Sequence, residues 1–348
     1  MRIDRIWSIS AQRTVGHPLD PTIGRVDVVR WSRGQATGQV DPLAIDELDG
    51  HVLVVDGVTA SDDGALAWIR RAPCVVVAAT PRGATASGAP DLVVGAGDEL
   101  LEALLARIEA NPHASRALVD VLRPMPELDV TTGLTLESLA YSTLLAGPEF
   151  AAWQASRSRP APRDHDGHPV RVERRGGELR ITLARPSNRN AFSAALRDAL
   201  FEAMTLAEVD ASVERVVLDA NGPAFSSGGD LTEFGTAPDV VRAHEVRTQR
   251  SVGALLARLG ERAVVHVHGT CVGAGVELPA FAARVVADRG STFRLPEVGM
   301  GLIPGAGGTV SITRRIGRQA TARLAILGEA IHAAEALALG LVDELTDG

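Results

Sequence analysis

The feature that most constrains the fold is an alternation of strand-like and helix-like segments in the second half of the chain. Short apolar runs typical of buried strands read RVVLDA, AVVHV and RVVAD. An amphipathic segment over 194–209 and a second helical segment over about 239–259 separate them. A helix between two strands returns the chain to the same sheet, so the alternation predicts an α/β fold from about residue 170.

Local signals mark the two ends of this region. The segment 170–186 predicts a β-hairpin that turns at Gly176-Gly177. Toward the other end, the glycines of 271–283 open a further helix, and helices are expected near 309–316 and 320–327. Strands alternate with helices throughout this region, which predicts an α/β part.

The first part of the chain shows a weaker version of the same pattern. HVLVVDG and PCVVVAAT predict buried strands around the helix-like DGALAWIRRA, and the chain becomes helical from Asp98. SRSRPAPRDHDGHP is rich in proline and arginine and has no apolar period, which predicts a linker. We expect an α/β part over 1–97, a helical segment over 98–160, a linker over 161–169 and a second α/β part over 170–348.

Composition excludes several classes of protein. A net charge of −8 argues against nucleic acid as a partner, and no apolar run reaches the ~18 residues that span a membrane. The N-terminus has no pattern of a signal peptide, so we expect the cytoplasm. Cys74 and Cys271 suggest neither a disulfide framework nor a metal cluster. All 35 basic residues are arginine, which excludes lysine chemistry and leaves arginine as the strong cation for an anionic ligand.

The glycine-rich segments do not match the common nucleotide or hydrolase motifs. GAGGT lacks the lysine of a P-loop, and the glycines at 273 and 275 lack the third glycine of a dinucleotide fingerprint. No histidine or cysteine spacing is typical of zinc, and no G-x-S-x-G marks a nucleophilic serine. We therefore expect no metal site.

Five motifs in register resemble the crotonase (enoyl-CoA hydratase/isomerase) superfamily over residues 170–345. In chain order they read RPSNRNAFS, NGPAFSSGGDL, HGTCVGAGVEL, FRLPEVGMGLIPGAGGT and GEAIHAAEALALGLVDEL. Several motifs in family order are a far stronger signal than any single glycine motif. The resemblance implies the ββα spiral core of that superfamily.

The resemblance also implies an acyl-CoA thioester as ligand, with coenzyme A as part of the substrate and no separate cofactor. In the family two backbone amides hold the enolate formed from the thioester carbonyl, and here they belong to Gly229 and Ala274. Such donors, aimed at developing negative charge, can each contribute about 3–4 kcal/mol. The residues at the family's coenzyme A positions are Arg189, Ala191, Ser227, Asp230 and Leu231.

Two glutamates stand where the hydratases of this family carry their acids. Glu277 and Glu297 could share one water, one ionised and the other protonated, and so hydrate a 2-enoyl-CoA to a 3-hydroxyacyl-CoA. Gly305 follows where an isomerase of dienoyl-CoA has an aspartate, which disfavours that activity, and we expect this glycine to border the water and the substrate. Other double-bond isomerisation, thioester hydrolysis, cofactor-free oxygenation and a non-catalytic acyl-CoA-binding role remain alternatives.

Members of the family continue beyond the last motif in helices that cover the site and build a trimer. Residues 91–160 resemble that segment, and the residues before them resemble a shortened core without the glutamate. We therefore expect two partial copies joined head to tail, with 1–97 a degenerate half and 98–160 the relocated helices. An unrelated helical domain is the alternative. The helices could cover their own site or a neighbour's, in a homotrimer or a hexamer.

Overall fold

The computed structural model describes residues 7–15, 26–33, 52–56, 69–80, 88–95, 99–158 and 167–347. Most of the helix expected over 63–72 and most of the linker expected over 161–169 lie outside the described residues.

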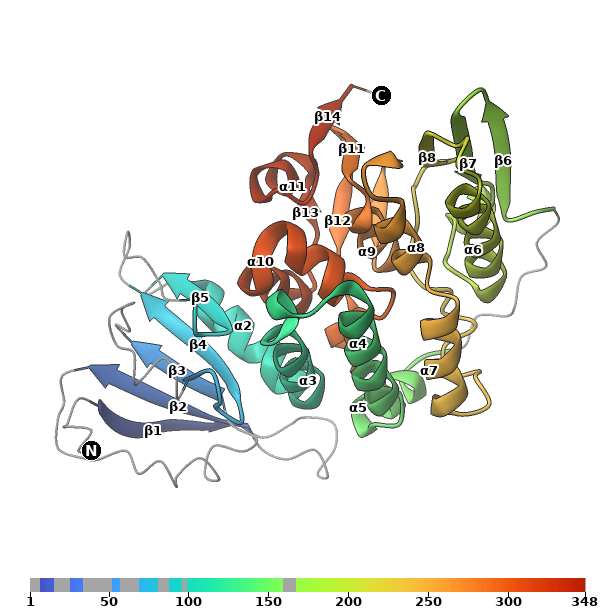
Figure 1. Ribbon diagram of the computed structural model, residues 1–348. Helices are drawn as coiled ribbons and strands as arrows, with labels where there is room; N and C mark the ends of the chain where they lie inside the picture. Colours follow the sequence, from blue (N-terminus) through green and yellow to red (C-terminus); the bar gives the residue numbers. More distant parts are fainter. Residues whose placement is uncertain are drawn as a thin grey trace.

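The first sheet has five strands in the order β1-β2-β3-β4-β5 (Figure 1). Its strands are β1 (Trp7–Val15), β2 (Val26–Arg33), β3 (Val52–Asp56), β4 (Val75–Thr80) and β5 (Leu92–Gly95). β1 is antiparallel to β2, and the remaining neighbours are parallel. The buried positions of β3 and β4 are valine, leucine and alanine apart from Thr80, as expected of strands covered on both faces.

The second sheet has six strands in the order β14-β11-β9-β8-β7-β6. Its strands are β6 (Val170–Arg175), β7 (Glu178–Leu183), β8 (Arg215–Ala220), β9 (Ala263–Val267), β11 (Arg284–Asp288) and β14 (Glu344–Thr346). β6 and β7 form the predicted hairpin, in which Arg175 pairs with Glu178 around Gly176-Gly177. All other neighbours in this sheet are parallel.

Both sheets thus begin with an antiparallel pair at one edge and continue with parallel strands. β1 to β5 of the first sheet follow the same order and pairing sense as β6, β7, β8, β9 and β11 of the second. Two copies of one core would give this likeness, and the origin from two copies stays a prediction. A third sheet orders β10 (Thr270–Val272), β12 (Thr292–Arg294) and β13 (Ile331–His332).

The described helices fall into two groups. Those between β5 and β6 follow one another without a strand, whereas those after β7 alternate with the strands of the second sheet, as the sequence predicts. In chain order the described helices are α2 (Glu99–Ala110), α3 (Pro112–Leu122), α4 (Val130–Leu145), α5 (Pro148–Ala155), α6 (Ala194–Val209), α7 (Val240–Gln249), α8 (Val252–Leu259), α9 (Ala274–Glu277), α10 (Gly308–Leu327) and α11 (Ala333–Leu339). Short 3₁₀ turns occur at Met125–Glu127, Pro186–Asn188, Gly260–Arg262, Pro279–Phe281 and Glu297–Met300.

Two helices differ from the prediction. The helix expected over about 239–259 is two helices, because Ser251 starts α8 by accepting a hydrogen bond from the Ala254 amide. The helix expected after the glycines at 273 and 275 is the single turn α9. Pro279 lies just beyond it and begins a 3₁₀ turn, since proline has no N–H to continue the α-helix.

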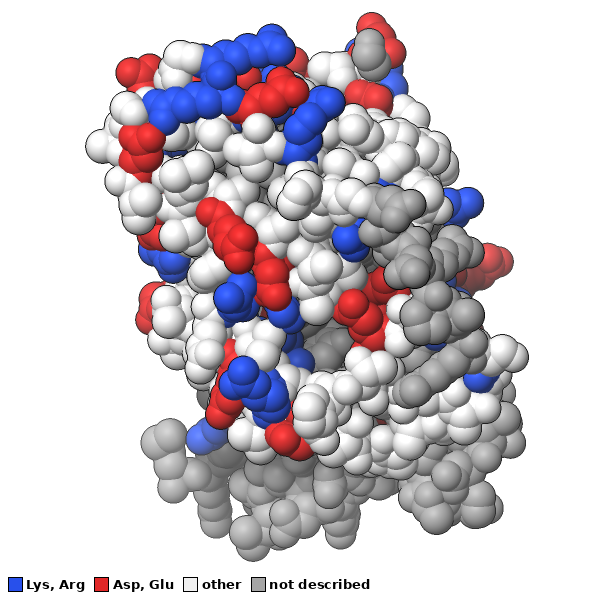
Figure 2. All heavy atoms as spheres, turned by 90° about the vertical axis from the view of Figure 1, so that its right-hand side faces the viewer, with Lys and Arg blue, Asp and Glu red and all other residues white. Residues whose placement is uncertain are grey.

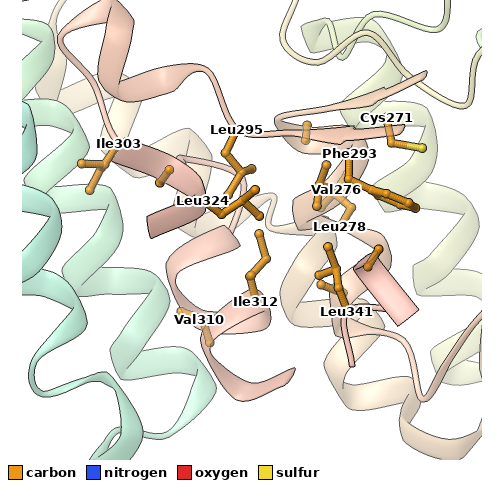
Figure 3. Packing of buried hydrophobic residues seen from close by; sticks show 14 of the residues in the cluster. Cys271, Val276, Leu278, Phe293, Leu295, Ile303, Val310, Ile312, Leu324 and Leu341 are labelled. Carbon is orange, nitrogen blue, oxygen red and sulfur yellow. The ribbon is translucent and has the colours of Figure 1, made fainter. Parts of the chain in front are cut away.

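The helices of the N-terminal part pack on the core of their own chain. α2, α3 and α4 contact α10, and α4 also contacts α7 (Figure 1). One hydrophobic cluster continues from β3 and β4 through α3 into the second sheet and α10. Figure 3 shows part of it, where Leu295, Leu324 and Ile312 lie close together. This packing covers the apolar face that α10 would otherwise expose.

A buried ion-pair network joins the first sheet to these helices. Asp91, 2% exposed, accepts hydrogen bonds from the Val76 amide at 2.9 Å and from Arg123 Nη2 at 2.7 Å. Arg318 of α10 makes a further ion pair with it at 3.4 Å. Arg123 also donates to the carbonyl oxygens of Ala72 and Cys74. Every partner of this aspartate is polar, as burial of a charge requires.

Candidate active site

Two of the sequence motifs meet at the carboxyl end of β7 and β8. The amide of Phe192 donates to the Gly228 carbonyl at 2.7 Å, and the amide of Asp230 donates to the Phe192 carbonyl at 3.1 Å. Asn190, fully buried with φ 52°, donates to the carbonyls of Asn221 and Ala224. The loop over 226–230 is therefore held along the segment 189–193, as the order of motifs predicts.

The two amides expected to hold an enolate belong to Ala274, at the start of α9, and to Gly229, in the loop over 226–230. Ala274 is the first residue of α9, where the N–H groups have no partner within the helix. Gly229 lies in the 226–230 loop, and a Cβ on it would come within 2.6 Å of the Phe234 ring, so the close packing requires glycine. Among the described residues, neither of these two amides donates a hydrogen bond to the protein.

Glu277 ends α9 and is 2% exposed. Its Oε2 accepts hydrogen bonds from the amides of Ala306 and Gly308, each at 2.8 Å. Gly308 fits beside it because a Cβ there would come within 2.7 Å of Glu277 Cγ. The glycine-rich segment after Glu297 thus brings its backbone against the first acid.

Glu297 begins the 3₁₀ turn after β12 and is 9% exposed. Gly273, with φ 48°, lies close to both acids. A Cβ on this glycine would lie 2.4 Å from Glu297 Oε1 and 3.8 Å from Glu277 Oε1. Because both distances start from the same point, the Oε1 atoms of Glu277 and Glu297 are no farther apart than the sum of the two distances. Glu297 Oε2 is buried and accepts no hydrogen bond from the described residues.

Burial raises the pKa of both acids and so makes both harder to ionise. Burial raises the pKa of Glu277 to about 7, against the hydrogen bonds from Ala306 and Gly308, which lower it. Burial and then the charge of Glu277 raise the pKa of Glu297 well above its usual value. Glu277 has two amide donors and Glu297 has an unpartnered oxygen, so Glu277 ionises first. Near neutral pH the pair can hold one carboxylate and one carboxylic acid.

A cavity of about 410 Å³ opens onto this pair. Its wall includes six of the residues singled out from the sequence: Gly229, Asp230, Ala274, Glu277, Glu297 and Gly305. Four others are not among its lining residues: Arg189, Ala191, Ser227 and Leu231. The roles predicted for all ten residues remain predictions.

Helices α4 and α5 supply a wall that the motifs did not reveal. Tyr141 and Leu145 of α4 and Phe150 and Gln154 of α5 line the cavity. The Tyr141 ring lies on Gly305, where an added Cβ would come within 2.4 Å of the ring. The resemblance of residues 91–160 to a site-covering segment was the one signal for this wall, and it named no residue.

α7 lines a neighbouring part of the cavity wall and is tied to α4. The Arg247 guanidinium lies over the Tyr141 ring, 4.7 Å from its centre, and donates to Ser138 Oγ at 3.0 Å. His244 Nδ1 also lies 2.9 Å from Ser138 Oγ, and Ser142 Oγ donates to the Val240 carbonyl at 3.1 Å. These bonds fix the wall of the cavity across two parts of the chain.

A larger cavity of about 600 Å³ lies between β5 and the helices α10 and α11. None of the residues singled out from the sequence lines it. Among the described residues, no three histidine, cysteine, aspartate or glutamate side chains are grouped to hold a metal ion. On the face drawn in Figure 2, arginine and acidic side chains are interspersed. No described helix has the length and apolar character needed to cross a membrane.

Comparison with known proteins agrees with the motifs. The family model for enoyl-CoA hydratase/isomerase matches residues 173–347, about half of the chain. A 2,3-dehydroadipyl-CoA hydratase of Escherichia coli is 33% identical over 174 residues, which cover 50% of this chain and 68% of that protein. A trans-2-decenoyl-[acyl-carrier-protein] isomerase of Streptococcus mutans is 34% identical over 172 residues, which cover 48% and 65%.

Among solved structures, an enoyl-CoA hydratase from Thermoplasma volcanium is 30% identical, with a TM-score of 0.48 over 52% of this chain and 73% of that one. The matches span about two thirds of the curated relatives' length. A family model over half of the chain and the hydratase relative at 33% identity together identify it. The chain belongs to the enoyl-CoA hydratase/isomerase family, the crotonase superfamily, and has its α/β fold.

Proposed function

We propose that the protein hydrates a 2-enoyl-CoA to a 3-hydroxyacyl-CoA. The observation that carries the proposal is the buried pair of Glu277 and Glu297, which line one cavity and whose Oε1 atoms both lie within 3.8 Å of the position that a Cβ on Gly273 would take. Addition of water to a C2=C3 double bond needs a base for the water and an acid for C2. A pair with unequal pKa values supplies both.

In this proposal Glu277 is the base and Glu297 the acid. The hydrogen bonds from Ala306 and Gly308 support the ionised form of Glu277, whereas Glu297 has an unpartnered buried oxygen and keeps its proton. Glu277 takes a proton from water as the water oxygen bonds to C3. The π electrons move onto C2 and the thioester carbonyl, and Glu297 then delivers its proton to C2.

The enolate oxygen formed on the way would accept hydrogen bonds from the amides of Gly229 and Ala274. Both residues line the same cavity as the acids, and Ala274 lies at a helix start, where the backbone favours negative charge. Arg189, Ala191, Ser227, Asp230 and Leu231 remain our proposed contacts for coenzyme A. We also propose a cytoplasmic homotrimer or hexamer.

Double-bond isomerisation is the second candidate, because the Streptococcus mutans relative is an isomerase at 34% identity. An isomerase moves a proton between two carbons and needs no water as reactant. The two reactions differ by the mass of one water in the product. Mass spectrometry of the product from a short 2-enoyl-CoA and from its 3-enoyl isomer therefore separates them.

The decisive variants are Glu297→Gln and Glu277→Gln. Loss of either proton-transfer group is expected to lower kcat by at least ~10²-fold, because each acts on bonds that change in the reaction. Binding of a saturated acyl-CoA, measured by calorimetry, is expected to persist, since the thioester tail and the two amides remain. Hydration at the wild-type rate in either variant would refute the assignment.

A further inference from the structure

Glu137 of α4 is a third buried acid at the site, and the roles given above do not use it. It is 1% exposed. Its Oε1 accepts a hydrogen bond from the Gly307 amide at 2.7 Å. Its Oε2 accepts from the amide and the hydroxyl of Thr309, at 2.9 and 2.7 Å. An acid buried this completely must have its acceptors filled, and the glycine-rich loop fills them.

The amides of the loop 306–309 donate alternately to two carboxylates. Ala306 and Gly308 donate to Glu277, and the amides that follow each of them donate to Glu137. The loop is therefore held from one side by an acid of the core and from the other by an acid of the relocated helices.

This arrangement occupies the start of α10. The first amides of a helix have no partner within the helix, and the helix dipole favours negative charge there. If Glu137 is removed, the amides of Gly307 and Thr309 lose their acceptor inside the protein. The loop then has to rearrange, and it would carry with it the two amides that hold Glu277. Gly307, with φ 106°, makes a backbone turn that depends on this support.

The two carboxylates also interact through their charges. Burial and then the charge of Glu277 raise the pKa of Glu137 to about 8, while its hydrogen bonds to Thr309 and Gly307 lower it. The ionisable groups near Glu137 include Arg247, Tyr141 and Glu297, which interact with its charge, and Arg197 and Arg250, which line the same small cavity as this acid.

We propose that Glu137 is a positioning residue for Glu277: it holds the loop 306–309 so that the Glu277 carboxylate stays directed into the cavity. The inference rests on the proposed function and adds a part of the chain to it. The helix α4 then belongs to the catalytic unit and does more than cover the site.

The direct test is residue-resolved amide hydrogen exchange of the loop, which needs no turnover. Glu137→Gln keeps the shape of the side chain but replaces one acceptor oxygen by an N–H₂ group. That group cannot accept a hydrogen bond from the backbone amides of the loop. We expect exchange at all four amides of 306–309 to accelerate by at least ~10-fold, because loss of their shared support frees the loop. Unchanged exchange at Ala306 and Gly308, with acceleration confined to Gly307 and Thr309, would overturn the inference.

The matched control is Glu149→Gln. Glu149 lies on α5, is 5% exposed and accepts hydrogen bonds from the amides of His113 and Ala114 at the start of α3. This variant is expected to lower the melting temperature and to leave exchange over 306–309 as in the wild type. It separates a general loss of stability from the specific effect of Glu137.

Kinetics give the second readout. We expect Glu137→Gln to lower kcat ~10–100-fold with KM changed by less than ~3-fold, as for other groups that orient a reacting residue. The acidic limb of the pH profile is expected to move to higher pH, because a freed loop withdraws the Ala306 and Gly308 amides, whose hydrogen bonds lower the pKa of Glu277. Thr309→Val, which removes one donor to Glu137, should shift the profile in the same direction by less.

The outcomes distinguish the two proposals. Wild-type activity in Glu277→Gln would refute the proposed function, whereas the exchange experiment would still decide whether Glu137 supports the loop. An inactive Glu277→Gln together with an unchanged kcat and pH profile in Glu137→Gln overturns the positioning role alone. If Glu137→Gln does not fold, Thr309→Val carries the test, and wild-type exchange over 306–309 in that variant overturns the inference.

Discussion

Gly273→Ala tests the geometry of the acid pair most sharply. The added Cβ would lie 2.4 Å from Glu297 Oε1, whereas ordinary contacts of a Cβ begin near 3.4 Å. The carboxylate must therefore move by about 1 Å, and a shift of that size in a reacting group can cost ~10²-fold in rate. The backbone adds a second term, because φ 48° with ψ −118° costs a non-glycine residue about 1–3 kcal/mol.

The assay measures kcat and KM for a short 2-enoyl-CoA, the melting temperature, and binding of a saturated acyl-CoA. We expect kcat to fall ~10²-fold and stability to fall by the strain above, with binding retained. Gly299→Ala is the control, because it lies two residues after Glu297 and a Cβ there meets nothing within 4 Å. A Gly273→Ala enzyme with wild-type kcat would refute the view that the two acids share this space.

Three further predictions follow from burial and charge. Activity should fall as pH drops through about 7, because Glu277 then gains a proton and cannot act as the base. The folded-state pKa of Glu277 lies above its unfolded value of 4.5, so its contribution to the free energy of unfolding is fully present below pH 4.5 and is lost as pH rises through about 7. Urea unfolding of Glu277→Gln should show a weaker dependence of stability on pH over this range. Arg123→Ala should cost about 3 kcal/mol by the same measurement, because it strips a partner from buried Asp91. Loss of the exposed pair in Arg116→Ala should cost less than about 1 kcal/mol.

Helices and strands were predictable from the sequence where a single local signal, such as apolar periodicity or a glycine pair, determined them. The bounds of α6 and β8 coincide with the apolar periodicity, and the two glycines at 176–177 place the hairpin turn. The prediction of one helix over about 239–259 is wrong, because Ser251 caps a second helix in the middle of the apolar pattern. The helix predicted after the glycines at 273 and 275 is longer than the observed α9, because Pro279 ends the α-helical turn and begins a 3₁₀ turn.

The site was predictable only as far as the motifs reached. The resemblance paired Glu277 with Glu297, and the structure brings both acids into one cavity wall with Gly229 and Ala274. It did not indicate Glu137 or Tyr141, because their contacts with the site join residues far apart in sequence and have no local signature. Glu137, for example, meets Gly307 across 170 residues.

Alone, the sequence determined the family, the alternation of strands and helices in the second half, and the two acids that the proposed chemistry requires. Only the tertiary structure decided what closes the cavity. The sequence predicts that the helices over 98–160 cover the core, but it does not say whether they pack on their own core or on a neighbour's. The packing of α2, α3 and α4 on α10 settles this for the chain, and it brings a third carboxylate to the loop that holds Glu277.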